Sequence, residues 1–229
     1  MRLLAFETAT EACSVAVYVD GAVHERFEIA PRRHAELALP WAELVLAEAG
    51  VSRSQLDAIA VGRGPGAFTG VRLAIAIAQG VALALDRPVL PVSTLAALAL
   101  QAGGEQRIAA IDARMGEVYL ARFQQDGDDL RALGDEVVVP PADAMHPGAA
   151  PWHGIGTGFG AQEGALRDRF ADVLASVEPA GLPRAGDVAR LAALAFQRGE
   201  AVAPERAEPA YLRNNVALTL VEQQALRKP

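Results

Sequence analysis

The sequence predicts an α/β protein in which a β-β-β-α-β-α-β-α unit occurs twice in tandem. In both halves of the 229-residue chain, apolar segments of strand length alternate in the same order with segments of helical periodicity. An Asp-Gly pair, typical of a tight hairpin turn, stands at the matching place in each half, at residues 20–21 and 126–127. Three antiparallel strands followed by two α-β crossovers is the ribonuclease-H-like order. Two such domains in tandem form the architecture shared by sugar kinases, actin and Hsp70.

The first domain is expected at residues 1–102. Its first helix has apolar residues at helical spacing and ends before Gly50, and Ser93 stands where it can cap the third helix. A Gly-rich loop at residues 62–70 leads into the second helix, which ends near Leu85. The expected strands lie at 3–7, 12–19, 22–29, 56–61 and 89–92, and the first and third helices at 35–48 and 94–101.

The second domain is expected at residues 103–205 and repeats this order. Pro140 and Pro141 open a short helical or loop segment in place of its first helix. Residues 206–229 form a tail that we expect to return to the first domain, with the part from Asn214 either a helix or a loose tail. The expected strands lie at 108–112, 117–124, 130–139, 152–155 and 173–177, and the expected helices at 162–170 and 185–197.

The composition argues against several classes of protein. Asp and Glu outnumber Lys and Arg by 28 to 21, and a net charge of −7 does not favour a nucleic-acid groove. The most apolar stretch, residues 71–85, is shorter than the ~18 residues that a membrane span requires, and the N-terminus lacks a signal-peptide pattern. The single Cys13 cannot form an internal disulfide, which fits a reducing cytoplasm.

A nucleotide site is one candidate, because the cleft of such tandem folds lies between the domains. Acids at the ends of the two first strands could position a metal–nucleotide, and a Gly-rich turn in the second domain could approach phosphate. Neither acid is followed at once by the glycine that a phosphate-binding hairpin normally uses, so a vestigial cleft and a turn needed for packing alone are the alternatives. The candidate residues are Glu7, Thr8, Asp112, Gly154, Gly156 and Gly158.

The residues disfavour nuclease and metal-hydrolase chemistry. A ribonuclease-H-type metal site needs an acid where the fourth strand ends, and Arg63 stands there instead. The four histidines include no His-x-x-x-His pair, since Ala38 stands four residues after His34. We therefore expect no metal site, a capping or packing role for His34, and a buried apolar role for Cys13.

The glycine-rich loop and the helix behind it are the most distinctive segment. Between residues 71 and 85 only Arg72 and Gln79 are polar, so this helix has no polar face and must be covered on every side. We expect a protein–protein interface; the alternatives are a structural turn and burial under the chain's own C-terminus. Thr69 could cap the helix, whose N-terminus could hold an anion. The expected interface residues are Pro65, Gly66, Phe68, Thr69, Gly70, Arg72, Leu73, Ala76, Ile77, Gly80 and Ala84.

Several segments closely resemble the signature of the bacterial TsaB (YeaZ) family and follow its order along nearly the whole chain. The most specific segment covers residues 64–72, after the predicted strand at 56–61. Ala67 departs from the commonest form of the signature, which has Ser there, so a role for that hydroxyl does not carry over. The other matching segments are residues 4–10, 33–37, 112–119 and 209–213.

This resemblance implies a subunit of the machinery that makes N6-threonylcarbamoyladenosine at position 37 of tRNAs reading codons that begin with A. It implies a non-catalytic platform that pairs through its N-terminal domain with the metal-dependent catalytic paralogue TsaD. The ATPase TsaE joins the pair, and homodimers form through a similar surface. We expect no cofactor to bind this chain tightly, although ATP could bind at the interface of the complex, and we expect tRNA to be bound indirectly through the complex. The alternative is a free-standing kinase-like ATPase using Glu7, Asp112 and the glycine turn at 154–160.

Overall fold

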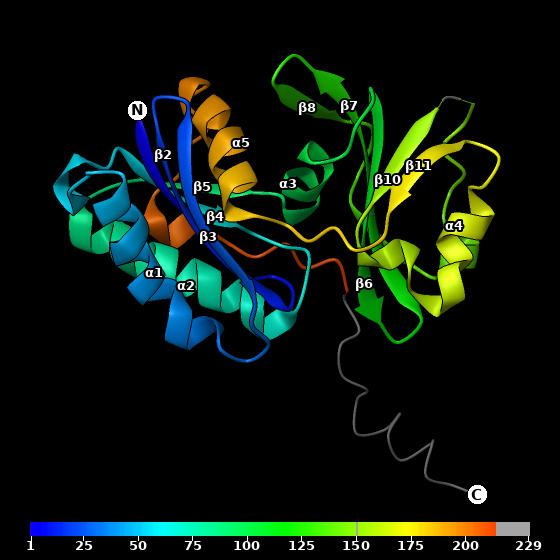
Figure 1. The fold of residues 1–229 in the computed structure, drawn as a ribbon, viewed down its shortest axis with the longest axis horizontal. Coiled ribbons are helices and arrows are strands. Elements are labelled where there is room, and N and C mark those ends of the chain that lie inside the picture. The colour runs from blue at the N-terminus through cyan, green and yellow to red at the C-terminus, as the bar shows by residue number, and fades with distance from the viewer. Residues whose placement is uncertain (150, 214–229) are drawn as a thin grey trace, which may run out of the picture.

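Two β-sheets stand side by side, each with helices packed on it (Figure 1). The computed structural model describes residues 1–149 and 151–213. The first sheet has the order β3-β2-β1-β4-β5, with β1 antiparallel to β2 and parallel to β4. Its strands are β1 (Arg2–Glu7), β2 (Ala12–Val19), β3 (Ala22–Ile29), β4 (Ala58–Gly62) and β5 (Val89–Val92).

The second sheet has the order β11-β10-β6-β7-β8, and β9 also pairs with β7. In both sheets the first strand of the unit is central, with its antiparallel followers on one side and the two parallel strands on the other. This topology confirms the predicted tandem ribonuclease-H-like fold. The strands are β6 (Gln106–Arg114), β7 (Glu117–Asp126), β8 (Asp129–Ala132), β9 (Val137–Val139), β10 (Trp152–Ile155) and β11 (Leu174–Glu178).

The helices do not all pack on the sheet that precedes them. α1 (His34–Glu48) and α2 (Phe68–Leu85) lie together on one face of the first sheet, and α5 (Ala185–Gln197) covers the other face (Figure 1). α3 (Thr94–Leu100) packs on the second sheet, whose opposite face carries α4 (Ala165–Arg169). Each half therefore places its last helix on the sheet of the other half. The predicted domain boundary between residues 102 and 103 stays a prediction.

The alternation of side chains along β1 builds both cores of the first sheet. Leu4 and Phe6 are buried with α1 and α2, whereas Leu3 and Ala5 are buried with α5. The sheet face under α5 is rich in alanine, and α5 presents alanines to it, so helix and sheet pack with small side chains between them. These alanines are Ala5, Ala16, Ala58 and Ala60 on the strands and Ala185, Ala189, Ala192 and Ala193 on α5.

Two segments of the second half differ from the prediction. The single strand expected at 130–139 is two strands, β8 and β9, because the chain turns between them at Gly134, whose φ is +119°. The helix expected at 162–170 shortens to α4, because Gln162 and Glu163 have φ values of +49° and +58° that an α-helix does not admit.

α2 is longer than its apolar stretch suggested. It begins at Phe68 and has 18 residues, so by length and composition it could cross a membrane, which corrects the expectation that no segment is long enough. One such helix is weak evidence for a membrane span, and α2 packs its buried side on the first sheet. Thr69 does not cap the helix: Ala67 is the N-cap residue and Thr69 lies within the first turn.

The C-terminal segment, residues 202–213, runs along α2 and reaches both halves of the molecule. It begins in a β-bridge to β5, and Ala207 is then buried in the core that contains α2. The Gln79 side chain of α2 donates to the Ala207 carbonyl oxygen at 3.1 Å. Arg213 donates to a carbonyl oxygen at the end of β6. The alternatives for the tail from residue 214 lie outside the described residues.

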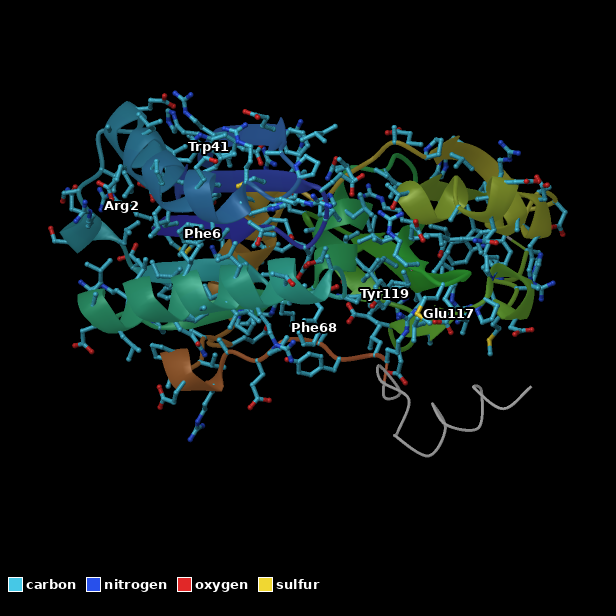
Figure 2. All side chains as sticks on the ribbon, turned by 90° about the horizontal axis from the view of Figure 1, so that it is seen from below. Arg2, Phe6, Trp41, Phe68, Glu117 and Tyr119 are labelled. Atoms are coloured by element: carbon cyan, nitrogen blue, oxygen red, sulfur yellow. The ribbon has the colours of Figure 1, made fainter. Side chains whose placement is uncertain are left out.

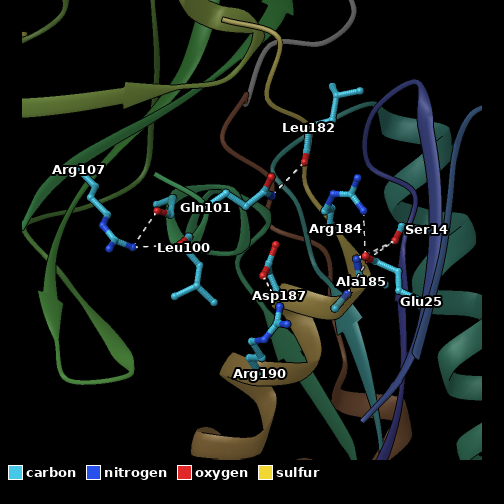
Figure 3. A network of polar contacts seen from close by, with 12 residues as sticks. Ser14, Glu25, Leu100, Gln101, Arg107, Leu182, Arg184, Ala185, Asp187 and Arg190 are labelled. Atoms are coloured by element: carbon cyan, nitrogen blue, oxygen red, sulfur yellow. Dashed lines mark hydrogen bonds and ion pairs between the residues drawn. The ribbon is translucent and has the colours of Figure 1, made fainter. Parts of the chain in front are cut away.

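Side chains from the first half hold the N-terminus of α5 in place (Figure 3). The Ala185 N–H donates to the Ser14 hydroxyl at 2.9 Å, and the Gly186 N–H donates to the Glu25 carboxylate at 2.9 Å. Ser14 donates to the same carboxylate at 2.8 Å, and Arg184 pairs with it at 2.9 Å. These groups satisfy helix N–H donors that have no partner within the helix, and so fix α5 on the first sheet.

Replacing Ser14 with alanine is therefore expected to lower the free energy of unfolding by about 1–3 kcal/mol, because the Ala185 N–H loses its buried acceptor. Urea denaturation measures this change. Ser54→Ala, at an exposed serine, is the control and should stay within about 0.5 kcal/mol of the parent chain. A Ser14→Ala effect as small as that of the control would contradict the anchoring role.

Candidate functional site

The outward face of α2, where the sequence predicts a protein–protein interface, is exposed in the structure. α2 lies between α1 and the C-terminal segment on one face of the molecule (Figure 2). Val71, Ile75 and Ala78 are buried toward the first sheet. On the outward side, Phe68 and Leu83 are 57% and 64% exposed. The C-terminal segment therefore covers one flank of α2, and the outward face remains accessible in the part of the chain that the structure describes.

The expected interface residues divide between this outward face and the interior. A Cβ at Gly80 would meet no atom within 4 Å. The middle of the outward face is therefore open, and no side chain projects from the helix at Gly80. Among the expected residues, Phe68, Thr69, Arg72, Ala76, Gly80 and Ala84 are exposed, Gly66, Leu73 and Ile77 are half-buried, and Pro65 and Gly70 are buried.

Sequence reasoning also left out two exposed apolar side chains of α1, the helix that lies beside α2. Leu39 and Leu44 are 50% and 44% exposed, and their spacing of five residues makes them point to different sides of α1. The signal was present in the sequence, because α1 has more apolar residues than its buried stripe of Ala38, Ala42 and Val45 requires.

Gly66 and Gly70 bring the start of α2 against the β1–β2 turn. A Cβ at Gly70 would overlap the Thr8 carbonyl oxygen, and a Cβ at Gly66 would overlap the carbonyl oxygen of Ala9. The Thr8 hydroxyl donates to the Gly70 carbonyl oxygen at 2.7 Å, and the Ala67 N–H donates to Ala9 at 2.7 Å. The glycines of this loop thus permit backbone-to-backbone packing within the chain.

Glu7 is enclosed at the same junction. One carboxylate oxygen accepts from the Ala9 N–H at 2.7 Å and the other from the Thr94 hydroxyl at 2.8 Å. A Cβ at Gly62 would overlap this carboxylate, so glycine at that position leaves the space that Glu7 fills. Burial raises the pKa of Glu7 from 4.5 to about 7, although both hydrogen bonds act in the opposite direction.

The glycine turn of the second half also packs on the chain's own atoms. A Cβ at Gly154 would stand 2.6 Å from the Phe159 ring, and one at Gly158 would stand 2.7 Å from the Ala110 Cβ. A Cβ at Gly156 would overlap the Ala110 carbonyl oxygen. These contacts favour the packing interpretation of the turn over a phosphate-binding one.

A cavity of about 620 Å³ lies between the two halves. Its walls are the β1–β2 turn, the start of α2, the β6–β7 turn and the end of the C-terminal segment. Of the residues expected to bind nucleotide, Asp112 lines the cavity and pairs with Arg114 at 2.9 Å, whereas Glu7, Thr8 and the three glycines do not line it. His34 lines it too, with its Nε2 3.0 Å from the Thr10 carbonyl oxygen. Cys13 is buried, as expected.

The burial of Glu7 predicts a specific pH dependence of stability. Its folded pKa lies above the unfolded value, so the favourable effect of the neutral carboxyl is fully present below pH 4.5 and is lost as pH rises through about 7. The free energy of unfolding of Glu7→Gln, relative to the parent chain, should therefore rise by about 3 kcal/mol across this window.

Denaturation at a series of pH values between 4 and 8 measures this difference. Glu11→Gln removes an exposed carboxylate from the same turn and is the matched control. If the free energies of unfolding of Glu7→Gln and the parent chain stay parallel over the whole pH series, burial does not raise the pKa of the Glu7 carboxyl.

The known proteins and the family model that this chain resembles match almost its full length, and they agree with one another. The model of the TsaD family, described as tRNA N6-adenosine threonylcarbamoyltransferase, matches residues 17–220. The "tRNA threonylcarbamoyladenosine biosynthesis protein TsaB" of Escherichia coli K12 is 44% identical over 95% of this chain and 96% of its own length. The protein of the same name from Haemophilus influenzae is 36% identical over 94% of this chain and 95% of its own.

Two solved structures from Pseudomonas aeruginosa share the fold. The structure titled "YeaZ from Pseudomonas aeruginosa" has a TM-score of 0.84 and 46% identity, covering 92% of this chain and 99% of its own. Another, described as an uncharacterized protein with similarity to peptidase YEAZ, has a TM-score of 0.86 and 47% identity, covering 93% and 99%. With this identity sustained over one shared fold, the chain belongs to the TsaB (YeaZ) family, within the wider TsaD family.

Proposed function

We propose that this chain is a platform subunit of the bacterial complex that transfers a threonylcarbamoyl group to adenosine 37 of tRNAs reading codons beginning with A. The E. coli and H. influenzae relatives are named as tRNA threonylcarbamoyladenosine biosynthesis proteins, which supports the process. The match of this chain to the TsaD family model, described as tRNA N6-adenosine threonylcarbamoyltransferase, supports the same process. The proposed compartment is the cytoplasm, where the tRNA substrate would be modified.

The observation that carries the platform role is the open apolar face of α2. An exposed apolar helix face of this length is costly in water and is typical of an interaction site. We assign this face to a TsaD-like catalytic subunit. A TsaE-like ATPase would join this pair, and a second copy of the chain would occupy the same face when no partner is present.

The arrangement of polar groups supports a role without catalysis in this chain. The Glu7 carboxylate and the Thr8 hydroxyl are bonded within the protein, and the described residues hold no cluster of three or more His, Cys, Asp or Glu suited to a metal ion. We propose that this chain alone binds no nucleotide tightly and that any ATP binds at the interface of the complex. The net charge of −7 favours tRNA binding through the partner subunits.

A charge placed on the outward face tests the platform role. Gly80→Asp should weaken the heterodimer at least about a hundredfold, because an unpaired carboxylate would be buried at the contact. The chain itself should still fold, since a Cβ at Gly80 has free space. Gly103→Asp, at another glycine with free space, is the control. Calorimetry with the TsaD-like subunit measures the affinity; an unchanged affinity for Gly80→Asp would refute the assignment of this face.

Nucleotide binding separates the platform from the free-standing ATPase. Titration of ATP with Mg²⁺ into the isolated chain should give no binding heat and no phosphate release, because Glu7 and the glycine turn face protein groups. The same titration into the assembled complex should give a binding signal. Stoichiometric ATP binding by the isolated chain would favour the ATPase instead.

A further inference from the structure

Arg72 is the single charged residue of α2, and two aromatic rings hold it in place. Its guanidinium carbon lies 3.2 Å from the centroid of the Phe68 ring, one helical turn earlier, and 5.1 Å from that of Tyr211 in the C-terminal segment. Both rings are themselves more than half exposed. Such stacking orients a guanidinium while leaving its N–H donors at the edge free to bond outward.

No carboxylate pairs with Arg72 among the residues that the structure describes. Most other arginines near α1 and α2 have acidic partners: Arg26 pairs with Glu48 and Arg53 with Glu43. Arg72 instead extends the exposed series formed by Thr69, Ala76, Gly80 and Leu83, at spacings of three or four residues along one side of the helix. Any element that covers the outward face of α2 along its length would therefore also cover Arg72.

Covering a guanidinium without a partner is strongly unfavourable, because the charge loses its water and gains nothing in return. The alanines and glycine that follow Arg72 leave room for one helix to approach closely, with α1 and the C-terminal segment on either side (Figure 2). A carboxylate matches the planar edge of an arginine with two parallel hydrogen bonds, which makes it the preferred partner at such a contact.

We propose that the partner subunit docks a helix on α2 that carries an Asp or Glu opposite Arg72, and that this pair sets the register of the two helices. This inference rests on the proposed function of the α2 face. Phe68 and Tyr211 act as positioning residues that hold the guanidinium ready. The pair would be largely shielded from water, so it contributes to specificity and to the rate of dissociation more than an exposed surface pair does.

The test compares the affinities of Arg72 variants for the intact TsaD-like subunit. Arg72→Gln should bind about ten- to a hundredfold more weakly, because the partner carboxylate is then buried without its charge partner. Arg72→Lys should fall between the parent chain and Arg72→Gln, since it keeps the charge but loses the planar edge. Arg131→Gln, at an exposed arginine of β8, is the matched control and should bind like the parent chain.

A charge exchange identifies the partner residue. Arg72→Glu should abolish binding, and one Asp→Arg or Glu→Arg substitution on the docking surface of the partner should restore it. Phe68→Leu, which keeps an apolar side chain but removes the ring, should weaken binding several-fold in the parent chain and by a smaller factor in Arg72→Gln, where the ring no longer positions a guanidinium. Thermal unfolding of each isolated variant monitors the fold.

The outcomes separate this inference from the proposed function. If Gly80→Asp disrupts the complex while Arg72→Gln binds like the parent chain, the carboxylate pair is refuted and the α2 interface stands. If neither variant changes the affinity, the interface itself is refuted. A loss of tRNA binding by the assembled complex, with subunit affinity unchanged in Arg72→Gln, would assign the guanidinium to RNA phosphate and would also overturn the pair.

Discussion

The close contact between the glycine-rich loop and the β1–β2 turn is the constraint on which the arrangement of the molecule depends. Gly66 and Gly70 have no Cβ, so their backbones reach the carbonyl oxygens of Ala9 and Thr8. This contact determines where α2 begins and which side of it meets the first sheet. An alanine at either position would push the loop away, and with it the helix that follows.

The same contact determines the chemistry of the junction. The acid at the end of β1 and the hydroxyl that follows it bond to backbone and side-chain groups of the loop and of α3. The groups that a kinase-like fold would present to a nucleotide are thus used to hold the first sheet, α2 and α3 together. This arrangement is why we propose the outside of α2, rather than the floor of the cleft, as the functional surface.

Local pattern was a reliable guide where the physical cause was local. The strands at 12–19, 22–29 and 89–92, the helix at 185–197 and the capping of α3 by Ser93 were predicted as observed, because periodicity and side-chain capping act within a few residues. The two strands at 130–139 were predicted as one. The local sequence around Gly134 fits a bend as well as a strand residue, and only the separate pairing of β8 and β9 with β7 shows that the chain turns there.

The sequence alone determined the strand order, the two-fold repetition and the absence of a polar face on α2, since each follows from the spacing of apolar residues and turns. The tertiary structure decided that α3 and α5 lie on exchanged sheets and that alanines line the contact between α5 and the first sheet. It also decided that the Glu7 side chain is buried and that Arg72 is exposed on the outward face of α2. The reason is that burial of a side chain depends on elements distant in sequence, whose approach no local pattern records.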